Sequence, residues 1–260
     1  MLELNNIKKT FNKGTPNEFI LYDGLSLKAE VGDHIVVVGS NGSGKSTLLN
    51  VIAGSVYVDS GSVVLNKIDV TNKKEYIRAQ DIGRVFQDPK MGTCSTMTIM
   101  ENMSLAYNKG NKYGMEAGLL KHKREMFKDM LRQLGISLEE KMETKAGALS
   151  GGQRQALALL MATMGNPKLL LLDEHAAALD PKTSAIVLDL TESFMTKDMT
   201  SIMVTHNLAD ALAHGNRLLM LHKGKVLLDI KGEEKKKMTI EALIHMFSKE
   251  EDVFTDTMLF

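Results

Sequence analysis

The sequence lacks most of the features that mark specialised protein classes. It has one cysteine, Cys94, so no internal disulfide can form, and we expect a reducing compartment. Lys plus Arg equals Asp plus Glu at 32 each, so the chain has no net positive charge to attract nucleic acid. Its apolar runs, such as residues 156–164, are shorter than the roughly 20 residues of a membrane helix. We therefore expect no nucleic-acid partner, and any membrane role must come through other proteins.

Other absences concern the organisation of the chain. Residues 1–11 contain no charged leader followed by an apolar stretch, so we expect no export signal. We find no internal repeat, low-complexity tract or Pro- or Ser-rich linker. With 43% apolar and 25% charged residues, the chain has the composition of an ordinary globular protein with a sizeable core.

Apolar patterning predicts a largely parallel sheet covered by helices, preceded by a strand pair with a loop between the strands. Residues 223–225 join two apolar stretches as a β-hairpin turn, and the lysines at 235–237 are expected on a solvated face. The strands are expected at residues 2–7, 19–27, 34–38, 61–65, 82–86, 169–172, 201–205 and 217–221. The helices are expected at residues 46–53, 98–107, 119–134, 153–164, 181–195, 208–214 and 239–247.

Residues 39–46 read GSNGSGKS and match a phosphate-binding loop, in the required position between a strand and a helix. Glycines let backbone N–H groups approach phosphates, and the positive end of the following helix faces the same charge. We expect Lys45 to contact the β- and γ-phosphates and the Ser46 hydroxyl to bind Mg²⁺. The sequence therefore predicts a site for a nucleotide.

An acid pair, Asp173 and Glu174, ends the apolar strand at residues 169–172. At a strand end beside a phosphate loop, Asp173 can bind Mg²⁺, and Glu174 can act as a general base toward a water molecule. A simpler alternative is that the two acids cap the next helix.

The motif that separates the possible nucleotide hydrolases is Leu-Ser-Gly-Gly-Gln at residues 149–153. Here the sequence resembles the ATP-binding cassette family, whose signature is this pentapeptide. Further motifs follow in the family's order: Gln87 after a strand, Asp180 beyond Glu174, and His206 after the strand at 201–205. Without the family, Ser150 and the two glycines would more simply be a loop and a helix cap.

The resemblance implies an ATPase in which each ATP lies between the phosphate loop of one copy and the signature of a second copy. It implies catalytic roles for Glu174, His206 and Gln87, and Mg²⁺ contacts from Ser46, Gln87 and Asp173. It also places Phe11 where the family stacks an aromatic ring on adenine. The expected nucleotide-binding residues are Phe11, Ser40, Asn41, Gly42, Ser43, Gly44, Lys45, Ser46, Thr47, Ser150, Gly151, Gly152, Gln153 and Asp180.

The implied fold is an α/β P-loop nucleotide hydrolase of the ABC type, with a mixed sheet core, an antiparallel β subdomain and a helical insert. We expect residues 1–260 to form a single cassette. Its expected parts are a core lobe (1–87 and 165–230), a helical signature lobe (88–164), and a C-terminal helix and tail (231–260).

The implied function is to energise a membrane transporter with ATP and Mg²⁺. We expect a homodimer, peripheral on the cytoplasmic face of the cell membrane, with integral membrane permease subunits and an extracellular substrate-binding protein as partners. Many members have proline after the catalytic acid, whereas this chain has His175. Residues 158–164, in the helix after the signature, also depart from the commoner arginine-containing form. In both respects the chain resembles bacterial tryptophan- or tyrosine-type uptake systems. The alternative is a soluble ABC-type ATPase that acts on nucleic acid or ribosomes, whose relatives carry long coiled-coil insertions or two cassettes.

Overall fold

The computed structural model describes residues 1–110 and 121–250, which form two compact units. The first unit comprises Met1–Arg78 and the chain from Lys197 onward, and the second comprises Ala79–Thr196. The lobe boundaries at residues 88 and 164 stay a prediction.

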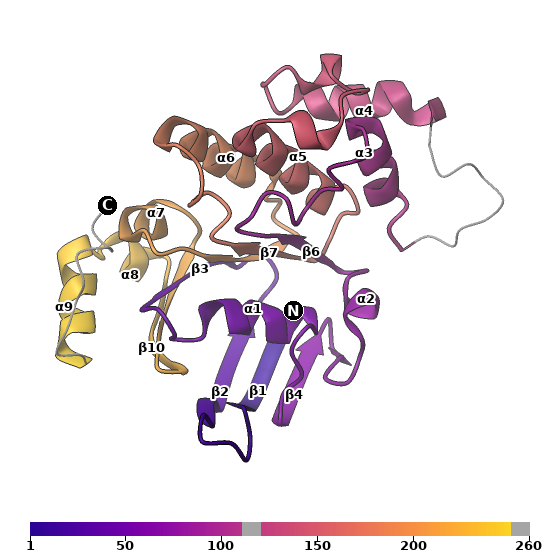
Figure 1. The fold of residues 1–260 in the computed structure, drawn as a ribbon. Coiled ribbons are helices and arrows are strands. Elements are labelled where there is room, and N and C mark those ends of the chain that lie inside the picture. Colours follow the sequence, from indigo (N-terminus) through magenta and orange to yellow (C-terminus); the bar gives the residue numbers. More distant parts are fainter. Residues whose placement is uncertain (111–120, 251–260) are drawn as a thin grey trace. The chain divides into compact units, whose positions relative to one another are not determined.

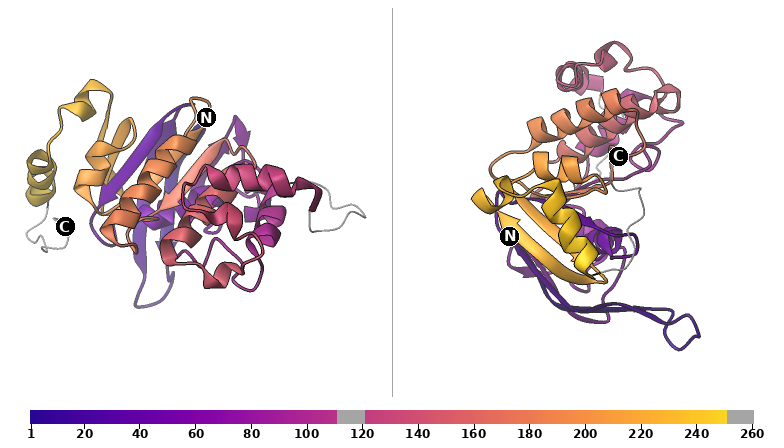
Figure 2. Two further views of the ribbon diagram at one scale, coloured as in Figure 1. Left: turned by 90° about the horizontal axis from the view of Figure 1, so that it is seen from above. Right: turned by 90° about the vertical axis from the view of Figure 1, so that its left-hand side faces the viewer.

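An antiparallel sheet in the first unit has the strand order β2-β1-β4-β5, of which Figure 1 labels β2, β1 and β4. Leu2, Leu4 and Ile7 are buried, as the sequence pattern predicted, and a register shift between Leu4 and Ile7 interrupts the strict alternation. The loop between β1 and β2 projects from this unit (Figure 2). The strands are β1 (Leu2–Phe11), β2 (Phe19–Ala29), β4 (Ser60–Leu65) and β5 (Ile68–Asp69). Sequence patterning missed β5 and the short helix α2 (Glu75–Arg78), because neither has enough residues to show a period.

A second group of strands in the first unit surrounds β3 (His34–Gly39), whose residues Ile35 to Gly39 are buried. It pairs in parallel with β8 (Thr200–Val204) on one side and β9 (Arg217–His222) on the other. The predicted hairpin then joins β9 to the antiparallel β10 (Lys225–Lys231). Helix α1 (Lys45–Ala53) follows β3, and α7 (Leu208–Ala213) follows β8.

The second unit combines a parallel strand pair with helices. Strand β6 (Ile82–Val85) pairs with β7 (Leu169–Asp173). Helix α5 packs against α3 and α6. The helices are α3 (Ile99–Tyr107), α4 (Arg124–Arg132), α5 (Gly151–Thr163) and α6 (Pro181–Phe194). Helix α4 lies within the range predicted as 119–134, of which residues 119 and 120 are outside the described residues.

These elements confirm the predicted α/β class with an antiparallel β subdomain and a helical part. Within residues 1–110 and 121–250, no helix is both long and apolar enough to span a bilayer.

The C-terminal segment corrects one expectation. Helices α8 (Glu233–Lys236) and α9 (Ile240–Glu250) close the described chain, and residues 251–260 of the expected tail lie outside it. Lys235 is buried, and its ammonium donates to the carbonyl oxygens of His214 and Gly215 just beyond α7. A cation there is favoured by the negative end of a helix. The prediction of a solvated lysine face is therefore wrong for Lys235.

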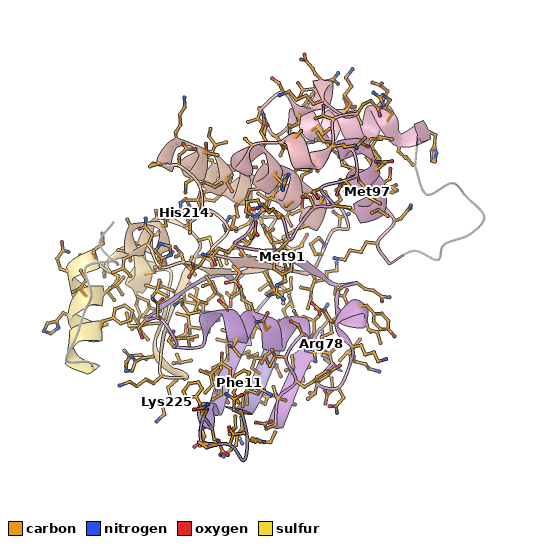
Figure 3. All side chains as sticks on the ribbon, in the orientation of Figure 1. Phe11, Arg78, Met91, Met97, His214 and Lys225 are labelled. Carbon is orange, nitrogen blue, oxygen red and sulfur yellow. The ribbon has the colours of Figure 1, made fainter. Side chains whose placement is uncertain are left out.

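Arg78 fastens the end of helix α1 (Figure 3). It is 2% exposed, and its guanidinium donates to four carbonyl oxygens, those of Val51, Ile52, Thr71 and Lys73. The first two belong to the last turn of α1, whose carbonyls lack partners within the helix. A Cβ on Gly54, the C-cap of α1, would lie 2.7 Å from the Arg78 Nε, so only glycine fits beside the guanidinium.

We predict that Arg78→Met lowers the free energy of unfolding by about 3 kcal/mol, because the buried carbonyls of Val51 and Ile52 and two partly buried carbonyls lose a charged donor. The measurement is urea unfolding, with Arg132→Met as the matched control. Arg132 is half-exposed and pairs with Asp129 on the surface of α4, so its loss should cost less than about 0.5 kcal/mol. Equal losses of unfolding free energy in the two variants would show that the buried hydrogen bonds of Arg78 do not stabilise the fold.

Candidate functional site

The predicted phosphate loop lies between β3 and α1, where β3 ends at Gly39 and α1 begins at Lys45. Gly42 and Gly44 have φ angles of 78° and 104°, in the left-handed region that favours glycine. Asn41, Gly42 and Ser46 are exposed, and the first turn of α1 contains no acidic residue. Such a loop at the N-terminus of a helix is suited to bind an anion.

Two carbonyls of the loop are held from behind by other elements. The buried Tyr22 hydroxyl on β2 donates to the Gly44 oxygen at 2.6 Å, and the Gly224 N–H in the β9–β10 hairpin donates to the Ser43 oxygen at 3.1 Å. In a trans peptide the C=O and N–H point in opposite directions. These bonds therefore direct the N–H groups of Lys45 and Gly44 away from Tyr22 and the hairpin.

The two hydrogen bonds from Tyr22 and Gly224, which we call the buttress of the loop, also require small residues at positions 44 and 224. A Cβ on Gly44 would lie 2.8 Å from the Tyr22 hydroxyl oxygen, and one on Gly224 would lie 1.6 Å from the Leu21 carbonyl oxygen. Burial raises the pKa of Tyr22, so its hydroxyl stays protonated and able to donate. Sequence reasoning missed Tyr22, because in the pattern it is one more residue of an alternating strand.

Lys45 lies across the loop and is 6% exposed. Its ammonium donates to the carbonyl oxygens of Gly39 at 2.7 Å and Ser40 at 3.1 Å. The buried hydroxyl of Ser43 has no hydrogen-bond partner among the described residues. Thr47 lies half-buried in the first turn of α1. The loop thus holds a concentrated set of donors, as a site for phosphate requires.

His206 and Phe11 are the other predicted site residues of the first unit. His206 follows β8, and the Asn207 side chain caps α7 through the N–H groups of Ala209 and Asp210. Burial raises the pKa of Asp210, while nearby His214 and His206 lower it. Phe11 ends β1, with the Lys9 ammonium 5.2 Å from its ring centroid.

In the second unit the structure brings Gln87 and Glu174 together. Strands β6 and β7 run in parallel, so the residues after them meet at one edge. The Gln87 Nε2 donates to the Glu174 Oε2 at 3.1 Å. Asp173 and Glu174 are half-buried, and no helix begins beside them, since Asp180 is the N-cap of the next helix. The alternative that the two acids cap this helix is therefore wrong.

The signature residues form the N-terminus of α5. Ser150 and Gln153 make a reciprocal capping box, in which the Ser150 Oγ accepts the Gln153 N–H and the Gln153 Oε1 accepts the Ser150 N–H, both at 3.3 Å. The helix-cap reading of this segment is thus correct locally. Because Ser150 accepts in the box, its hydroxyl proton can still be donated to a ligand.

The two signature glycines differ in their surroundings. A Cβ on Gly152 would lie 2.0 Å from the Thr183 Cγ2 on α6, whereas one on Gly151 would meet only Leu179 at 3.6 Å. Close packing of α5 on α6 therefore requires glycine at 152 but not at 151. Asp180 accepts the Thr183 N–H at 3.1 Å, and hydrogen bonds from the Thr183 side chain and backbone lower its pKa.

Two polar residues of α5 that sequence reasoning missed support these loops. The Gln155 Nε2 donates to the carbonyl of Phe86, which precedes Gln87, at 2.9 Å, and Gln155 is fully buried. The Arg154 guanidinium donates to the Ala146 carbonyl in the turn before Ser150. Their signal in the sequence is a run of three long polar residues, Gln153 to Gln155, before the apolar part of the helix.

Residues 22–177 match the family described as ABC transporter. The chain belongs to this family. It is 46% identical over 250 residues to the tyrosine transport ATP-binding protein of Clostridioides difficile (strain R20291), covering 95% of this chain and 98% of that protein.

Solved ABC structures have the same fold. A dimeric ATP-binding cassette in a post-hydrolysis state with ADP and Pi matches with a TM-score of 0.74 and 29% identity, over 89% of this chain and 98% of that one. A nucleotide-free cassette matches with a TM-score of 0.77 and 28% identity, over 95% and 98%. The chain is therefore an ATP-binding subunit of a transporter and an ABC-type ATPase, as the motif order predicted.

We predict that Tyr22→Phe weakens ATP binding about fivefold, because the Gly44–Lys45 peptide loses a bond of about 1 kcal/mol that orients its N–H. Calorimetric titration with ATP measures the affinity. Tyr76→Phe is the matched control, since Tyr76 is 68% exposed and its hydroxyl should not affect the loop. An unchanged affinity in Tyr22→Phe would show that the buttress does not orient the loop.

Proposed function

We propose that this ABC subunit energises uptake of an amino acid, and that two copies hydrolyse ATP held between them. The observation that carries the catalytic part is the Gln87–Glu174 hydrogen bond, which places an amide and a carboxylate at one strand edge. The amino-acid cargo is supported by the 46% identity, over nearly the whole chain, to a tyrosine transport protein.

ATP binding is assigned to the loop between β3 and α1. The N–H groups of residues 41–46 and the Lys45 ammonium would neutralise the phosphate charge. Lys45 would exchange its contacts with the Gly39 and Ser40 carbonyls for phosphate oxygens, which bear far more charge. Phe11, whose ring is already stacked with one cation, is the proposed contact for adenine.

The residues proposed for Mg²⁺ offer the hard oxygen donors that this ion prefers, namely the Ser46 hydroxyl, the Asp173 carboxylate and the Gln87 amide oxygen. The Gln87 Nε2 donates to Glu174, which leaves its Oε1 as the atom suited to a cation. When bound, Mg²⁺ would supply positive charge to the β- and γ-phosphate oxygens.

Hydrolysis is assigned to Glu174 as general base. Glu174 takes a proton from a water molecule as the water oxygen bonds to the γ-phosphorus, and the bond to the β–γ bridging oxygen breaks. The electron pair of that bond leaves with ADP, and the γ-phosphoryl group departs as inorganic phosphate. Gln87 orients the carboxylate, and His206 donates to the γ-phosphate.

The signature would complete the site of a second copy. The Ser150 hydroxyl proton and the first N–H groups of α5 are suited to bind the γ-phosphate of that copy's ATP. Gly151, which has room for a side chain within its own chain, would be glycine because the second copy's nucleotide approaches it closely. Asp180 lies at the N-terminus of α6, which packs on α5.

The transporter would also need membrane-spanning permease subunits and an extracellular substrate-binding protein. This chain would then lie peripherally on the cytoplasmic face of the membrane. Closure of the dimer on ATP would move the permease, and hydrolysis would reopen it.

We predict that Glu174→Gln slows ATP turnover by about 10²-fold or more, since the variant keeps the shape of the side chain but loses the base. ATP binding should persist, and light scattering should show dimers with ATP and Mg²⁺ but not with ADP. Glu125→Gln, on the exposed face of α4, is the matched control and should turn over normally.

The same variant tests the direction of transport. In cells whose only copy of this gene carries Glu174→Gln, uptake of labelled tyrosine or a related amino acid should fall to background. Near-normal turnover of the purified variant would rule out Glu174 as the base. Increased accumulation of the amino acid in the cells would contradict import.

A further inference from the structure

His175, the residue after Glu174, is anchored inside the second unit. It is 2% exposed, and its Nε2 lies 2.8 Å from the Oγ1 of Thr191, which is 1% exposed. The Thr191 hydroxyl in turn donates to the carbonyl of Val187 at 2.7 Å, one turn earlier on α6. A buried chain of hydrogen bonds thus joins the residue beside Glu174 to the C-terminal half of α6.

The direction of this bond follows from the number of protons. A threonine hydroxyl carries one proton, and Thr191 gives it to Val187. Its oxygen can therefore only accept from the ring, so the Nε2 of His175 carries a hydrogen. Histidine at this position acts as a hydrogen-bond donor to helix α6.

Glu174 needs such support, because its backbone is in a sparsely populated conformation. Its φ is 44°, which a residue with a side chain rarely adopts and which surrounding structure must enforce at a cost of roughly 1 kcal/mol. The Ala177 N–H donates to the Glu174 carbonyl at 3.0 Å and tightens the turn that follows. Further on, the Asp180 side chain caps the N-terminus of α6. The segment from Glu174 to Asp180 is therefore tied to α6 at its far end by the cap and near its start by His175.

We propose that His175 is a positioning residue, which holds the Glu174 carboxylate in its catalytic orientation through the His175–Thr191 hydrogen bond. The inference rests on the proposed role of Glu174 as general base. Proline at position 175 could stiffen the backbone but could not donate to Thr191, so this chain holds its turn through α6 instead.

The test compares variants that remove or keep the bond. His175→Leu and Thr191→Val remove it at similar volume, whereas His175→Gln and Thr191→Ser keep a donor and an acceptor. We expect the first two to lower kcat about tenfold with the KM for ATP unchanged, because a misplaced base costs rate and not binding. The second two should stay within about twofold of wild type. The double variant His175→Leu/Thr191→Val should be no slower than either single variant, since both remove one interaction.

Thermal unfolding and the Glu174→Gln variant separate the possible outcomes. A kcat loss with KM unchanged in fully folded Thr191→Val, rescued in Thr191→Ser, supports positioning, even if His175→Leu does not fold. Wild-type turnover in His175→Leu and Thr191→Val, or losses that only follow the folded fraction, would overturn it. If Glu174→Gln itself turned over normally, the proposed base would be wrong, and this outcome is independent of the results at 175 and 191.

Discussion

The structure depends on the orientation of a few peptide planes in the loop between β3 and α1. We propose that backbone N–H groups recognise phosphate there, and the carbonyls of the same peptides then turn away from the phosphate toward donors of the chain. The Tyr22 hydroxyl supplies such a donor to the Gly44 carbonyl, and the Gly224 N–H supplies one to the Ser43 carbonyl. The antiparallel sheet and the β-hairpin of the first unit therefore both take part in orienting the loop. Each contributes one donor to the rear of the loop.

In the second unit, neighbouring residues orient the carboxylate of Glu174. Glu174 has a strained backbone, so its side chain is useful only if neighbouring groups determine its direction. Gln87 does so by a direct hydrogen bond, and Gln155 holds the carbonyl just before Gln87. Gln155 lies on the helix that begins with the signature. A shift of α5 would therefore move the Phe86 carbonyl and, with it, Gln87. Communication between the signature and the proposed base therefore has a physical route within this unit.

The sequence predicted most strands and helices, because long periodic runs such as residues 169–172 and 46–53 depend on burial and local propensity. It also placed the motifs at the correct element ends, since a phosphate loop and a strand-end acid pair are local in sequence. Arg78, Lys235, Tyr22 and His175 were not predictable in the same way. Each has its role because the folded chain brings a carbonyl or hydroxyl close to it. A run of lysines predicts a solvent-exposed face, and only the fold shows that Lys235 binds carbonyls at the end of α7.

The central claim is that each ATP is handled by Lys45 of one copy and Ser150 of another. It can be tested by measuring the turnover of Lys45→Ala and Ser150→Arg separately and then mixed. Each variant alone should be inactive, because every site in its homodimer is defective. In the mixture, a heterodimer has one site with both residues intact, so turnover should return, up to about a quarter of the wild-type rate if chains pair at random. Turnover that stays at background in the mixture, while ATP-dependent heterodimers form, would contradict the shared site.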